Sequence, residues 1–578
     1  AVAIILVAIP GVFYALYGRK MNVDAEHKAR IMELDEHAQI IVFERSGYVS
    51  YANCGLPYYI GGTIADPEAL TLQTPESFRA RFNVDMRVNH EATALDVQAK
   101  TVTVKNLVTG EVFKESYDKL ILSPGAKPTQ PRLRGVGLEH VFTLRTVEDT
   151  FRMKEFIDAH HPRTAVIAGG GFIGLELAEN MREIGMEVTI VQRPQQLMKP
   201  FDPDMAAFIH AEARKHGIKL ALGHTVEGFR ETGDGVEMLL ADTDPIPADM
   251  VVLAIGVTPD THLASEAGLA MGVRGSILVN DHMETSAPDV YAVGDAVQVK
   301  HLVTGEETLI SLAGPANKQG RIAADNICGI PSTYRGSQGS SVIKVFDITA
   351  ASTGVNETVA KAAGLAVDHV ILSPMSHAGY YPGGKLMTMK VVFEKETYRL
   401  LGAQIVGYEG VDKRIDVLAT AIFAGLRATE LKDLDLAYAP PYSSAKDPVN
   451  MAGFMIENIE EGIVKQWYLG QLEELQDRSA RGEVTLLDVR TPAEIALGRI
   501  SGFVNIPLDS LRERVGELDR EKPVYVICQS GLRSYVACRI LAGNGFDAFN
   551  FAGGFRYFET VVRDRALIKA AFPCGADQ

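Results

Sequence analysis

A glycine-rich turn between a strand and a helix is the feature of this sequence that most constrains its fold. Residues 163–193 read as an apolar strand, the turn GGGFIG at 169–174, an amphipathic helix, a stop at Gly185 and a second strand. A βαβ unit of about 30 residues with such a turn presents backbone N–H groups and a helix N-terminus to a pyrophosphate. A glycine turn without a ligand is the alternative, but both flanking elements are present. We therefore predict a dinucleotide-binding unit here.

Further apolar segments predict several α/β domains. The segments at 38–45, 120–126 and 289–295 read as buried strands, of which the first and last run into an acidic residue. Beyond about residue 470, short apolar strands alternate with helical stretches and predict an independent α/β domain. At 578 residues, the chain is too long for one hydrophobic core.

Composition and cysteine spacing exclude several classes of protein. The net charge of −16 disfavours binding to nucleic acid, and the cysteines are too scattered for a disulfide framework or a zinc site. We expect no metal, and a reducing, cytoplasmic setting. The uncharged segment Ala1–Gly18 is interrupted by Pro10 and Gly11. It is open to three interpretations: a membrane anchor, which we consider the weaker one, a buried first strand, or a non-native start.

Two of the cysteines lie in informative surroundings. Cys54 stands in SYANCGLPYY, where position 59 is Tyr, so no second thiol is near enough for a local disulfide. A single redox thiol must cycle through a mixed disulfide or a sulfenic acid. Cys528 begins CQSGLRS between a strand and a helix. In such a loop, backbone N–H groups and the helix N-terminus lower the pKa of a thiol and stabilise its persulfide.

These motifs resemble known families over nearly the whole chain. Residues 32–455 resemble the flavoprotein pyridine nucleotide-disulfide reductases, because Glu44 ends IIVFE and VYAVGD ends at Asp295. SYANCGLPYY, YYPG at 380–383 and YAPPYSSAKDP at 438–448 are similar to the coenzyme A-disulfide reductase branch. Residues 470–565 are similar to the rhodanese family. Together they resemble fusions of the two, which include NADH-dependent persulfide or polysulfide reductases.

The resemblance implies an α/β fold class with two Rossmann-like three-layer nucleotide-binding domains, an α+β dimerisation domain and a C-terminal rhodanese α/β domain. The expected ranges are 1–150 and 263–330 for the two parts of the FAD-binding domain, 151–262 for the NAD(P)H-binding domain, 331–455 for the dimerisation domain and 465–570 for the rhodanese domain.

The resemblance also implies the residues of the sites. The catalytic ones would be Cys54, Cys528, Tyr381, Tyr438 and Arg533. Those that bind substrate would be Ser50, Asn53, Lys446, Tyr380 and Arg30. Those that bind cofactors would be Glu44, Arg45, Ser123, Gly125, Gly169, Gly171, Phe172, Ile173, Gly174, Gln192, Gly256, Gly294, Asp295 and Ala313.

The implied activity is NAD(P)H- and FAD-dependent reduction of sulfur–sulfur bonds in coenzyme A persulfide, polysulfide or coenzyme A disulfide. Cys54 would form the mixed disulfide, Cys528 would relay sulfane sulfur, and the chain would be a homodimer. Coenzyme A would be a substrate or a tightly bound mixed disulfide. Arg193 follows Gln192 at the strand end, so NADH and NADPH both stay open.

One departure from the family pattern keeps alternatives open. No GxGxxG loop precedes Glu44 at the expected spacing of about 20–25 residues, which puts retention of flavin in question. One alternative is a peroxidase or oxidase that cycles Cys54 through sulfenic acid. The other is a sulfurtransferase whose reductase half is degenerate.

Overall fold

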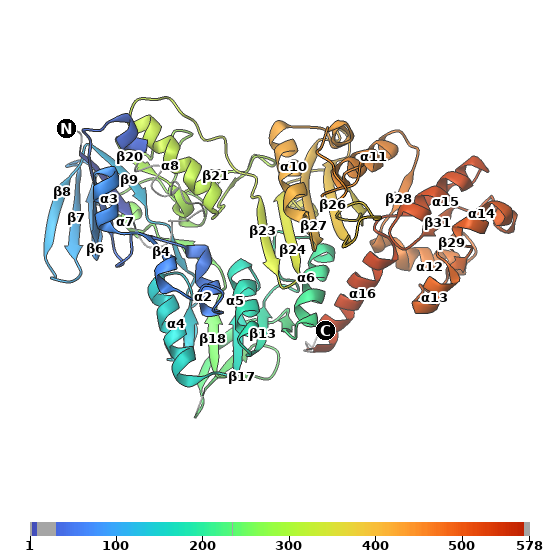
Figure 1. The fold of residues 1–578 in the computed structure, drawn as a ribbon, viewed down its shortest axis with the longest axis horizontal. Helices are drawn as coiled ribbons and strands as arrows, with labels where there is room; N and C mark the ends of the chain where they lie inside the picture. Colours follow the sequence, from blue (N-terminus) through green and yellow to red (C-terminus); the bar gives the residue numbers. More distant parts are fainter. Residues whose placement is uncertain (1–2, 9–29, 234, 572–578) are drawn as a thin grey trace. The chain divides into compact units, whose positions relative to one another are not determined.

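The computed structural model describes residues 3–8, 30–233 and 235–571. They form two compact units, which we describe separately (Figure 1). Unit one contains the described residues of 1–197 and 217–339, and unit two contains Met198–His216 and Ser340–Ala571. Both units combine parallel or antiparallel sheets with helices, so the predicted α/β class is confirmed. Among the described residues, no helix is both long enough and apolar enough to cross a membrane.

The first sheet of unit one is parallel and has the order β20-β9-β1-β2-β5. Its strands are β1 (Ala3–Ala8), β2 (Gln39–Glu44), β5 (Val84–Val88), β9 (Lys119–Ser123) and β20 (Val290–Ala292). Residues Ala3–Ala8 of the N-terminal segment form a strand, as one of the three interpretations expected, and β1 pairs with both β2 and β9. The missing glycine loop and most of the uncharged segment fall at residues 9–29, outside the described residues.

The second sheet of unit one is also parallel, with the order β11-β18-β12-β13-β14. Its strands are β11 (Val141–Thr143), β12 (Thr164–Ala168), β13 (Glu187–Gln192), β14 (Lys219–Leu222) and β18 (Met250–Leu253). Helix α5 (Phe172–Glu183) connects β12 to β13, as the glycine turn predicted. The side chains of β12 are buried after its first residue, which is typical of a parallel sheet covered on both faces.

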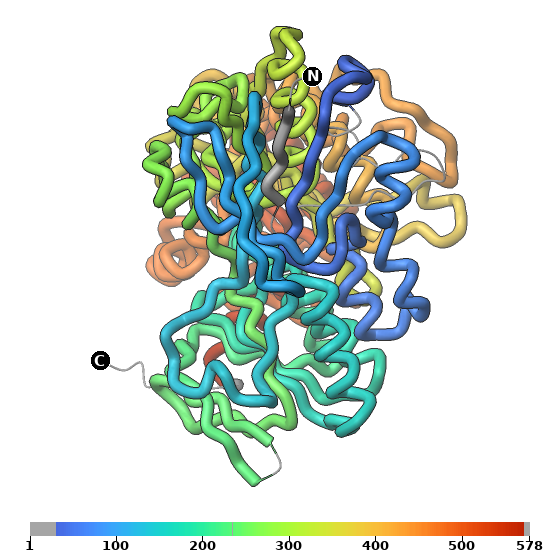
Figure 2. Tube along the Cα trace, turned by 90° about the vertical axis from the view of Figure 1, so that its left-hand side faces the viewer, coloured from blue at the N-terminus to red at the C-terminus, as the bar shows by residue number. Residues whose placement is uncertain are grey.

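Antiparallel strands and further helices complete unit one. The sheet β6-β7-β8 can be followed in blue in Figures 1 and 2. The strands are β3 (Ser50–Tyr51), β4 (Thr71–Gln73), β6 (His90–Asp96), β7 (Thr101–Asn106), β8 (Val112–Ser116), β10 (Ala126–Pro128), β15 (Val226–Glu231), β16 (Val236–Leu240), β17 (Ile246–Ala248), β19 (Val257–Pro259), β21 (Val299–Lys300) and β22 (Glu307–Thr308). The helices are α2 (Leu56–Ile60), α3 (Pro75–Phe82), α4 (Val147–His160), α7 (His262–Glu266) and α8 (Ala313–Ile327).

Unit two begins with an antiparallel sheet of order β23-β24-β27-β26-β25. Its strands are β23 (Ser341–Val345), β24 (Ile348–Gly354), β25 (Val367–Leu372), β26 (Met387–Glu394) and β27 (Leu400–Gly407). The helices around it are α6 (Pro203–Lys215), α9 (Glu357–Ala362), α10 (Val411–Ala424) and α11 (Pro448–Glu460). Every residue of β27 is buried, so this strand forms the centre of the core.

A buried lysine attaches α6 to this sheet, although the sequence analysis assigned that helix to the range 151–262. Lys390 Nζ lies 3.1 Å from Asp202, 2.9 Å from Asp204 and 2.8 Å from Glu357. Burial alone lowers the pKa of Lys390, but the three carboxylates outweigh it and raise that pKa above its ordinary value. Tyr557 on the last helix also donates to Asp204, at 2.7 Å. This cluster therefore connects α6, the antiparallel sheet and the C-terminal helix.

A second, parallel sheet of order β28-β32-β31-β29-β30 completes unit two. Its strands are β28 (Lys465–Trp467), β29 (Thr485–Asp488), β30 (Val504–Asn505), β31 (Val524–Ile527) and β32 (Ala548–Phe551). Its helices are α12 (Leu472–Ala480), α13 (Pro492–Leu497), α14 (Leu508–Arg514), α15 (Leu532–Gly543) and α16 (Gly554–Ala571). Trp467 is fully buried and donates to Val526 O at 3.2 Å, which fixes β28 at the edge of this sheet.

Candidate active site

The glycine turn after β12 has the backbone geometry of a dinucleotide site. Gly169 has φ +116°, and a Cβ there would lie 2.2 Å from Ala254 O. At Gly174, a Cβ would lie 2.0 Å from Gly169 O, because the helix packs closely on the turn. A Cβ at Gly171 would meet nothing within 4 Å. The outer glycines thus permit the turn and the packing, and the middle one leaves its backbone open to a ligand.

The remaining residues predicted for this turn surround it. Phe172 and Ile173 form the first positions of α5, where N–H groups have no partner within the helix. Gln192, at the end of β13, accepts a hydrogen bond from the N–H of Gly170 at 3.1 Å. The following residue, Arg193, is exposed.

The residues predicted to bind FAD gather at the carboxyl edge of the first sheet. The register aligns Ala8 of β1 with Glu44 of β2 and with Ser123 of β9. Glu44 is buried and accepts from the N–H of Ser46 at 2.8 Å. Ligands of open α/β sheets bind at this edge.

Asp295 provides a direct test of fit, since it is buried behind β20. Its Oδ2 accepts from Arg145 at 3.0 Å, and its Oδ1 has no hydrogen-bond partner among the described residues. The preceding Gly294 has φ +81° and donates its N–H to Gln319 at 2.7 Å. A buried carboxylate oxygen that lacks a donor is suited to a ligand hydroxyl. The described residues therefore fit a flavin nucleotide.

The other predicted cofactor and substrate residues of unit one come from several separate segments. Arg45 lies 3.7 Å from Asp260, and Ala313 is the first residue of α8. Gly125 and Gly256 have φ of +67° and +104°, in the two segments that pair as β10 and β19. Arg30 donates to Asp325 at 2.8 Å, so its charge is already paired within the protein.

Cys54 lies on a short turn that leads into α2. The turn Asn53–Gly55 follows β3, and Ser50 on that strand is buried with no partner for its Oγ among the described residues. The side chain of Cys54 is exposed, yet its surroundings raise the pKa of the thiol to about 11. Desolvation is the main cause, the negative charge of Glu176 adds to it, and Arg145 opposes it. The pKa of Glu176 is itself raised to about 7, by desolvation and then by Glu179.

The predicted tyrosines lie on two loops of unit two. Tyr380 and Tyr438 come from different loops, and their hydroxyl oxygens are 2.8 Å apart. Tyr381 packs edge-on against His377, with ring centroids 5.5 Å apart. Tyr380 and Tyr442 are 76% and 72% exposed, so the loops carry large aromatic rings at the surface of unit two.

A buried arginine holds these two loops together. Arg414 on α10 donates to Ser376 O at 3.0 Å and to Tyr442 O at 3.1 Å. It also pairs with Asp447, which caps α11. One side chain thus fixes both tyrosine loops, and sequence reasoning missed it because its partners lie far away along the chain. Lys446, beside Asp447, is exposed and lies 5.7 Å from the ring centroid of Phe454.

Cys528 is enclosed by its own loop at the start of α15. Its side chain is buried, and its Sγ accepts from the N–H of Gly531 at 3.1 Å and from Ser534 Oγ at 3.3 Å. Gly531 has φ +98°, a conformation that glycine adopts without strain. The loop therefore supplies hydrogen-bond donors to a sulfur anion, as its sequence predicted.

Arg533 of the same loop is held by a carboxylate rather than by the sulfur. It forms two hydrogen bonds with Glu494 of α13, at 2.7 and 2.5 Å. This hydrogen-bonded pair lowers the pKa of Glu494 to about 2. Behind the loop, Arg490 pairs with Asp488 at 2.8 Å, and both are buried.

Comparison with known proteins assigns the chain to a family. The family model described as pyridine nucleotide-disulphide oxidoreductase matches residues 25–320, its dimerisation domain matches 340–448, and a rhodanese-like domain matches 471–560. This chain belongs to the pyridine nucleotide-disulphide oxidoreductase family.

Three similar proteins refine this assignment. Coenzyme A disulfide reductase of Staphylococcus haemolyticus (strain JCSC1435) is 34% identical over 75% of this chain and 96% of that protein. The crystal structure of reduced Bacillus anthracis CoADR-RHD is 46% identical, with a TM-score of 0.92 over 98% of this chain and 99% of that one. The structure of a NAD-dependent persulfide reductase from A. fulgidus is 35% identical, with a TM-score of 0.88 over 96% of this chain and 100% of that one. The predicted family and rhodanese fusion are confirmed.

In this oxidoreductase, the two predicted thiols fall in different units, Cys54 in unit one and Cys528 in unit two. Besides Arg414, the sequence analysis missed Glu176, Arg145 and Ser534. Ser534 had a signal, a hydroxyl in the first turn of the helix that follows the nucleophile. Glu176 and Arg145 had none, because only the tertiary fold brings their charges to bear on Cys54.

Proposed function

We propose that this chain uses NAD(P)H and FAD to reduce the sulfur–sulfur bonds of coenzyme A disulfide and coenzyme A persulfide, or of polysulfide. The observation that carries the proposal is the isolated thiol of Cys54, exposed at the start of α2 within the unit that contains the dinucleotide-type glycine turn. No second cysteine of the described chain lies near it in sequence. The thiol therefore has no local partner for a disulfide, which supports its reaction with an external sulfur compound.

The thiolate of Cys54 would attack one sulfur of the substrate. With coenzyme A disulfide, the S–S bond breaks, one coenzyme A leaves as its thiolate, and the other stays on Cys54 as a mixed disulfide. With coenzyme A persulfide, attack on the inner sulfur releases hydrosulfide and gives the same mixed disulfide. When bound, FAD and NAD(P)H supply the two electrons that split this disulfide into the Cys54 thiolate and coenzyme A.

The residues that would hold these groups are those that the resemblance implies, and all of them except Lys446 lie in unit one. Glu44, Ser123 and Asp295 would bind FAD, together with Arg45, Gly125, Gly256, Gly294 and Ala313. Gly169, Gly171, Phe172, Ile173, Gly174 and Gln192 would bind NADH or NADPH. Ser50, Asn53 and Lys446 would bind coenzyme A, and Arg30 would contribute only if its pairing with Asp325 opens.

Cys528 would add sulfurtransferase chemistry to the reductase. Its Sγ would take the terminal sulfur of a persulfide or polysulfide and pass it to coenzyme A, with Arg533 beside the loop. Coenzyme A persulfide formed there is the substrate that Cys54 reduces. The net products are sulfide and thiol.

A homodimer and a cytoplasmic location are part of the same proposal. The exposed tyrosines at the two loops support a homodimer in which Tyr380, Tyr381 and Tyr438 reach the partner's reductase site. The cysteines of the described residues are all free, which supports a cytoplasmic location.

The test is anaerobic oxidation of NADH and of NADPH by the flavin-loaded protein, with coenzyme A disulfide, coenzyme A persulfide or polysulfide. We expect Cys54→Ser to abolish turnover with all three substrates and Cys528→Ser to impair mainly polysulfide. Cys328→Ser, a substitution of a thiol outside both sites, is the matched control. Full turnover by Cys54→Ser would contradict the proposal.

The same assay separates the alternatives. Rapid NADH consumption with peroxide or dioxygen but none with coenzyme A disulfide or persulfide would indicate a peroxidase or oxidase. A protein that binds no flavin yet transfers sulfur from thiosulfate to cyanide would indicate a sulfurtransferase alone.

A further inference from the structure

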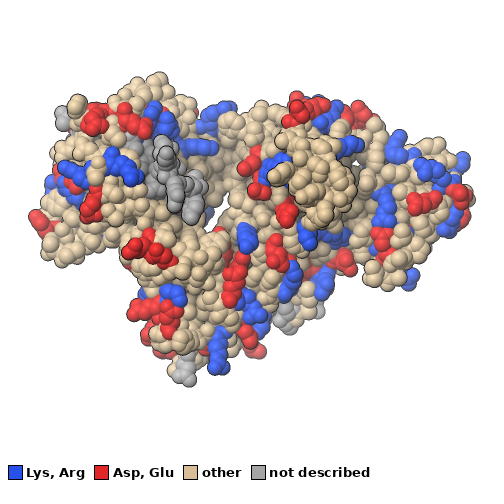
Figure 3. All heavy atoms as spheres, in the orientation of Figure 1, with Lys and Arg blue, Asp and Glu red and all other residues tan. Residues whose placement is uncertain are grey.

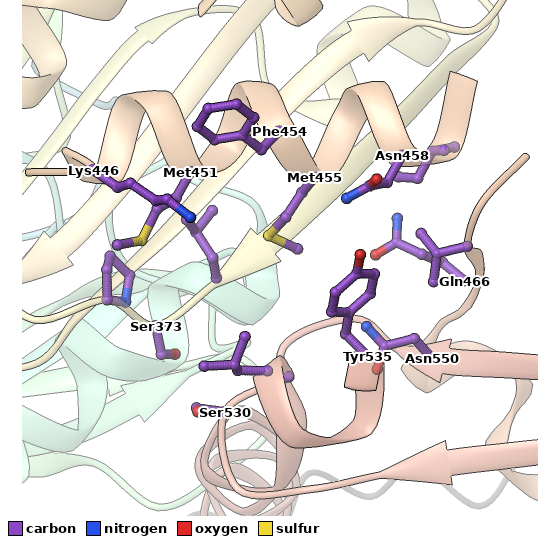
Figure 4. Close-up of a pocket in the computed structure, with 16 residues that line it drawn as sticks. Ser373, Lys446, Met451, Phe454, Met455, Asn458, Gln466, Ser530, Tyr535 and Asn550 are labelled. Atoms are coloured by element: carbon purple, nitrogen blue, oxygen red, sulfur yellow. The ribbon is translucent and has the colours of Figure 1, made fainter. Parts of the chain in front are cut away.

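A cavity in unit two lies against the loop of Cys528. Its volume is about 590 Å³, within the usual range for sites of small organic ligands. Helix α11 contributes Met451 and Met455, and the loop contributes Ser530, Gly531 and Leu532 (Figure 4). The N–H of Gly531 is one of the donors to Cys528 Sγ, so the cavity borders a residue that hydrogen-bonds the sulfur.

Three polar side chains of this cavity have buried oxygen atoms that lack a donor. Ser373 Oγ, Gln466 Oε1 and Asn550 Oδ1 have no hydrogen-bond partner among the described residues. The Asn550 side chain is only 4% exposed. A buried oxygen that has lost its water and gained no donor is unfavourable. These oxygens therefore call for a ligand that provides hydrogen-bond donors.

The polar groups are distributed unevenly around the apolar lining. Figure 4 shows the amides of Asn458, Gln466 and Asn550 at one end with the hydroxyl of Tyr535, whereas Lys446 lies at the other end. Carbonyl oxygens repel small sulfur anions such as thiosulfate, and apolar walls do not solvate them. An uncharged chain with amide N–H groups satisfies both the oxygens and the walls.

We propose that this cavity binds the amide-bearing chain of an organic thiol or persulfide while its sulfur exchanges with Cys528. This inference rests on the proposed sulfurtransferase role of Cys528. The incoming thiolate attacks the outer sulfur of the Cys528 persulfide, the bond between that sulfur and Sγ breaks, and Cys528 leaves as a thiolate. The acceptor becomes a persulfide, its proton having gone to solvent, and no external oxidant or reductant is needed.

A second cavity of unit two is lined by residues of the tyrosine loops. Met451 lines both the cavity beside Cys528 and this second one of about 330 Å³, which Tyr380 and Tyr438 also line. The chain that binds beside Cys528 thus lies next to the residues expected at the reductase site of the dimer.

The experiment loads Cys528 of the full-length chain with sulfane sulfur and measures its discharge to coenzyme A, pantetheine, glutathione and cyanide. Cyanide needs no amide site and is the reference acceptor. We expect Met455→Trp, which fills the cavity, and Asn550→Leu, which removes one unpaired oxygen, to lower the ratio of the rate with coenzyme A or pantetheine to the rate with cyanide by about tenfold. Leu497→Trp, at a position that is 88% exposed and outside the cavity, should leave the ratio unchanged.

Each outcome decides the proposal. A selective loss for pantetheine and coenzyme A identifies a pantetheine chain, and a selective loss for glutathione identifies a peptide thiol; either supports the amide site. An unchanged ratio in both variants, or an equal loss for cyanide, overturns it. Turnover of coenzyme A disulfide through Cys54 is measured in parallel, so failure of the proposed reductase function is recognised separately.

Discussion

The two thiols that we propose as reactive, Cys54 and Cys528, are placed by opposite means. Cys528 is buried and its sulfur accepts from Gly531 and Ser534, which lie within six residues of it. Cys54 is exposed, accepts no hydrogen bond at its sulfur from the described residues, and is influenced by Glu176 and Arg145, which are distant in sequence. The comparison teaches that a local loop can complete one sulfur site, whereas the other depends on the tertiary fold.

The largest expected effect separates the two thiols completely. Cys528→Ser should reduce sulfur transfer from thiosulfate to cyanide by about a thousandfold or more, because the nucleophile is lost. Cys54→Ser should not change this rate, since Cys528 has its donors within its own loop. The measurement is thiocyanate formation, and Cys538→Ser tests whether the neighbouring buried thiol can substitute. Loss of sulfur transfer in Cys54→Ser would contradict the conclusion that the Cys528 site is complete without Cys54.

A smaller effect tests the local donors. Ser534→Ala removes one hydrogen bond to a sulfur anion and should lower the same rate about tenfold or more. Ser510→Ala, on α14, is the matched control, because within the described part of the chain its hydroxyl donates to Pro507 O and not to the sulfur. Equal rates in both variants would mean that the backbone alone stabilises the sulfur.

The third prediction concerns the remote charge on Cys54. Glu176→Gln removes a negative charge that raises the thiol pKa, so that pKa should fall below about 11. Above the Glu176 pKa of about 7, the carboxylate is ionised, and alkylation of Cys54 at pH 8 should therefore be about two- to threefold faster in the variant. Mass spectrometry of the reduced full-length chain gives the rate. Glu183→Gln on the same helix is the control, and a rate unchanged by Glu176→Gln would show that desolvation alone sets the pKa.

The smallest effect is the pH-dependent contribution of the Glu494–Arg533 pair, beside the Cys528 loop, to the free energy of unfolding. Glu494 has its pKa lowered to about 2 by Arg533, so the pair stabilises the fold above the unfolded pKa of about 4.3, and this contribution is lost as the pH falls toward 2. Both side chains are about one-third exposed, so Glu494→Gln should cost no more than about 1 kcal/mol at pH 7. Urea unfolding at pH 7 and pH 3 measures the difference. A deficit that persists undiminished at pH 3 would contradict this origin.

The features of the molecule divide in the same way into local ones, which the sequence predicts, and ones that depend on the tertiary fold. The turn GGGFIG and the loop CQSGLRS were predicted with their strands and helices, because each acts through backbone geometry over a few consecutive residues. The sequence also allows the prediction that Glu44 and Ser123 lie at one edge of a sheet, since parallel strands align their carboxyl ends. The contacts of Arg414 with both tyrosine loops, and the cluster around Lys390, were not, because their partners come from separate segments.

The sequence by itself thus determined the α/β class, the family with its rhodanese-like domain, and the turn of Cys528 between a strand and a helix, all of which depend on local order along the chain. Only the tertiary structure decided the pKa of Cys54, the attachment of α6 through Lys390, and the cavity with unpaired oxygens beside Cys528. These three features depend on burial, and on charged groups and cavity-lining side chains that distant segments contribute. The spacing of neighbouring residues encodes neither the burial nor these long-range contacts.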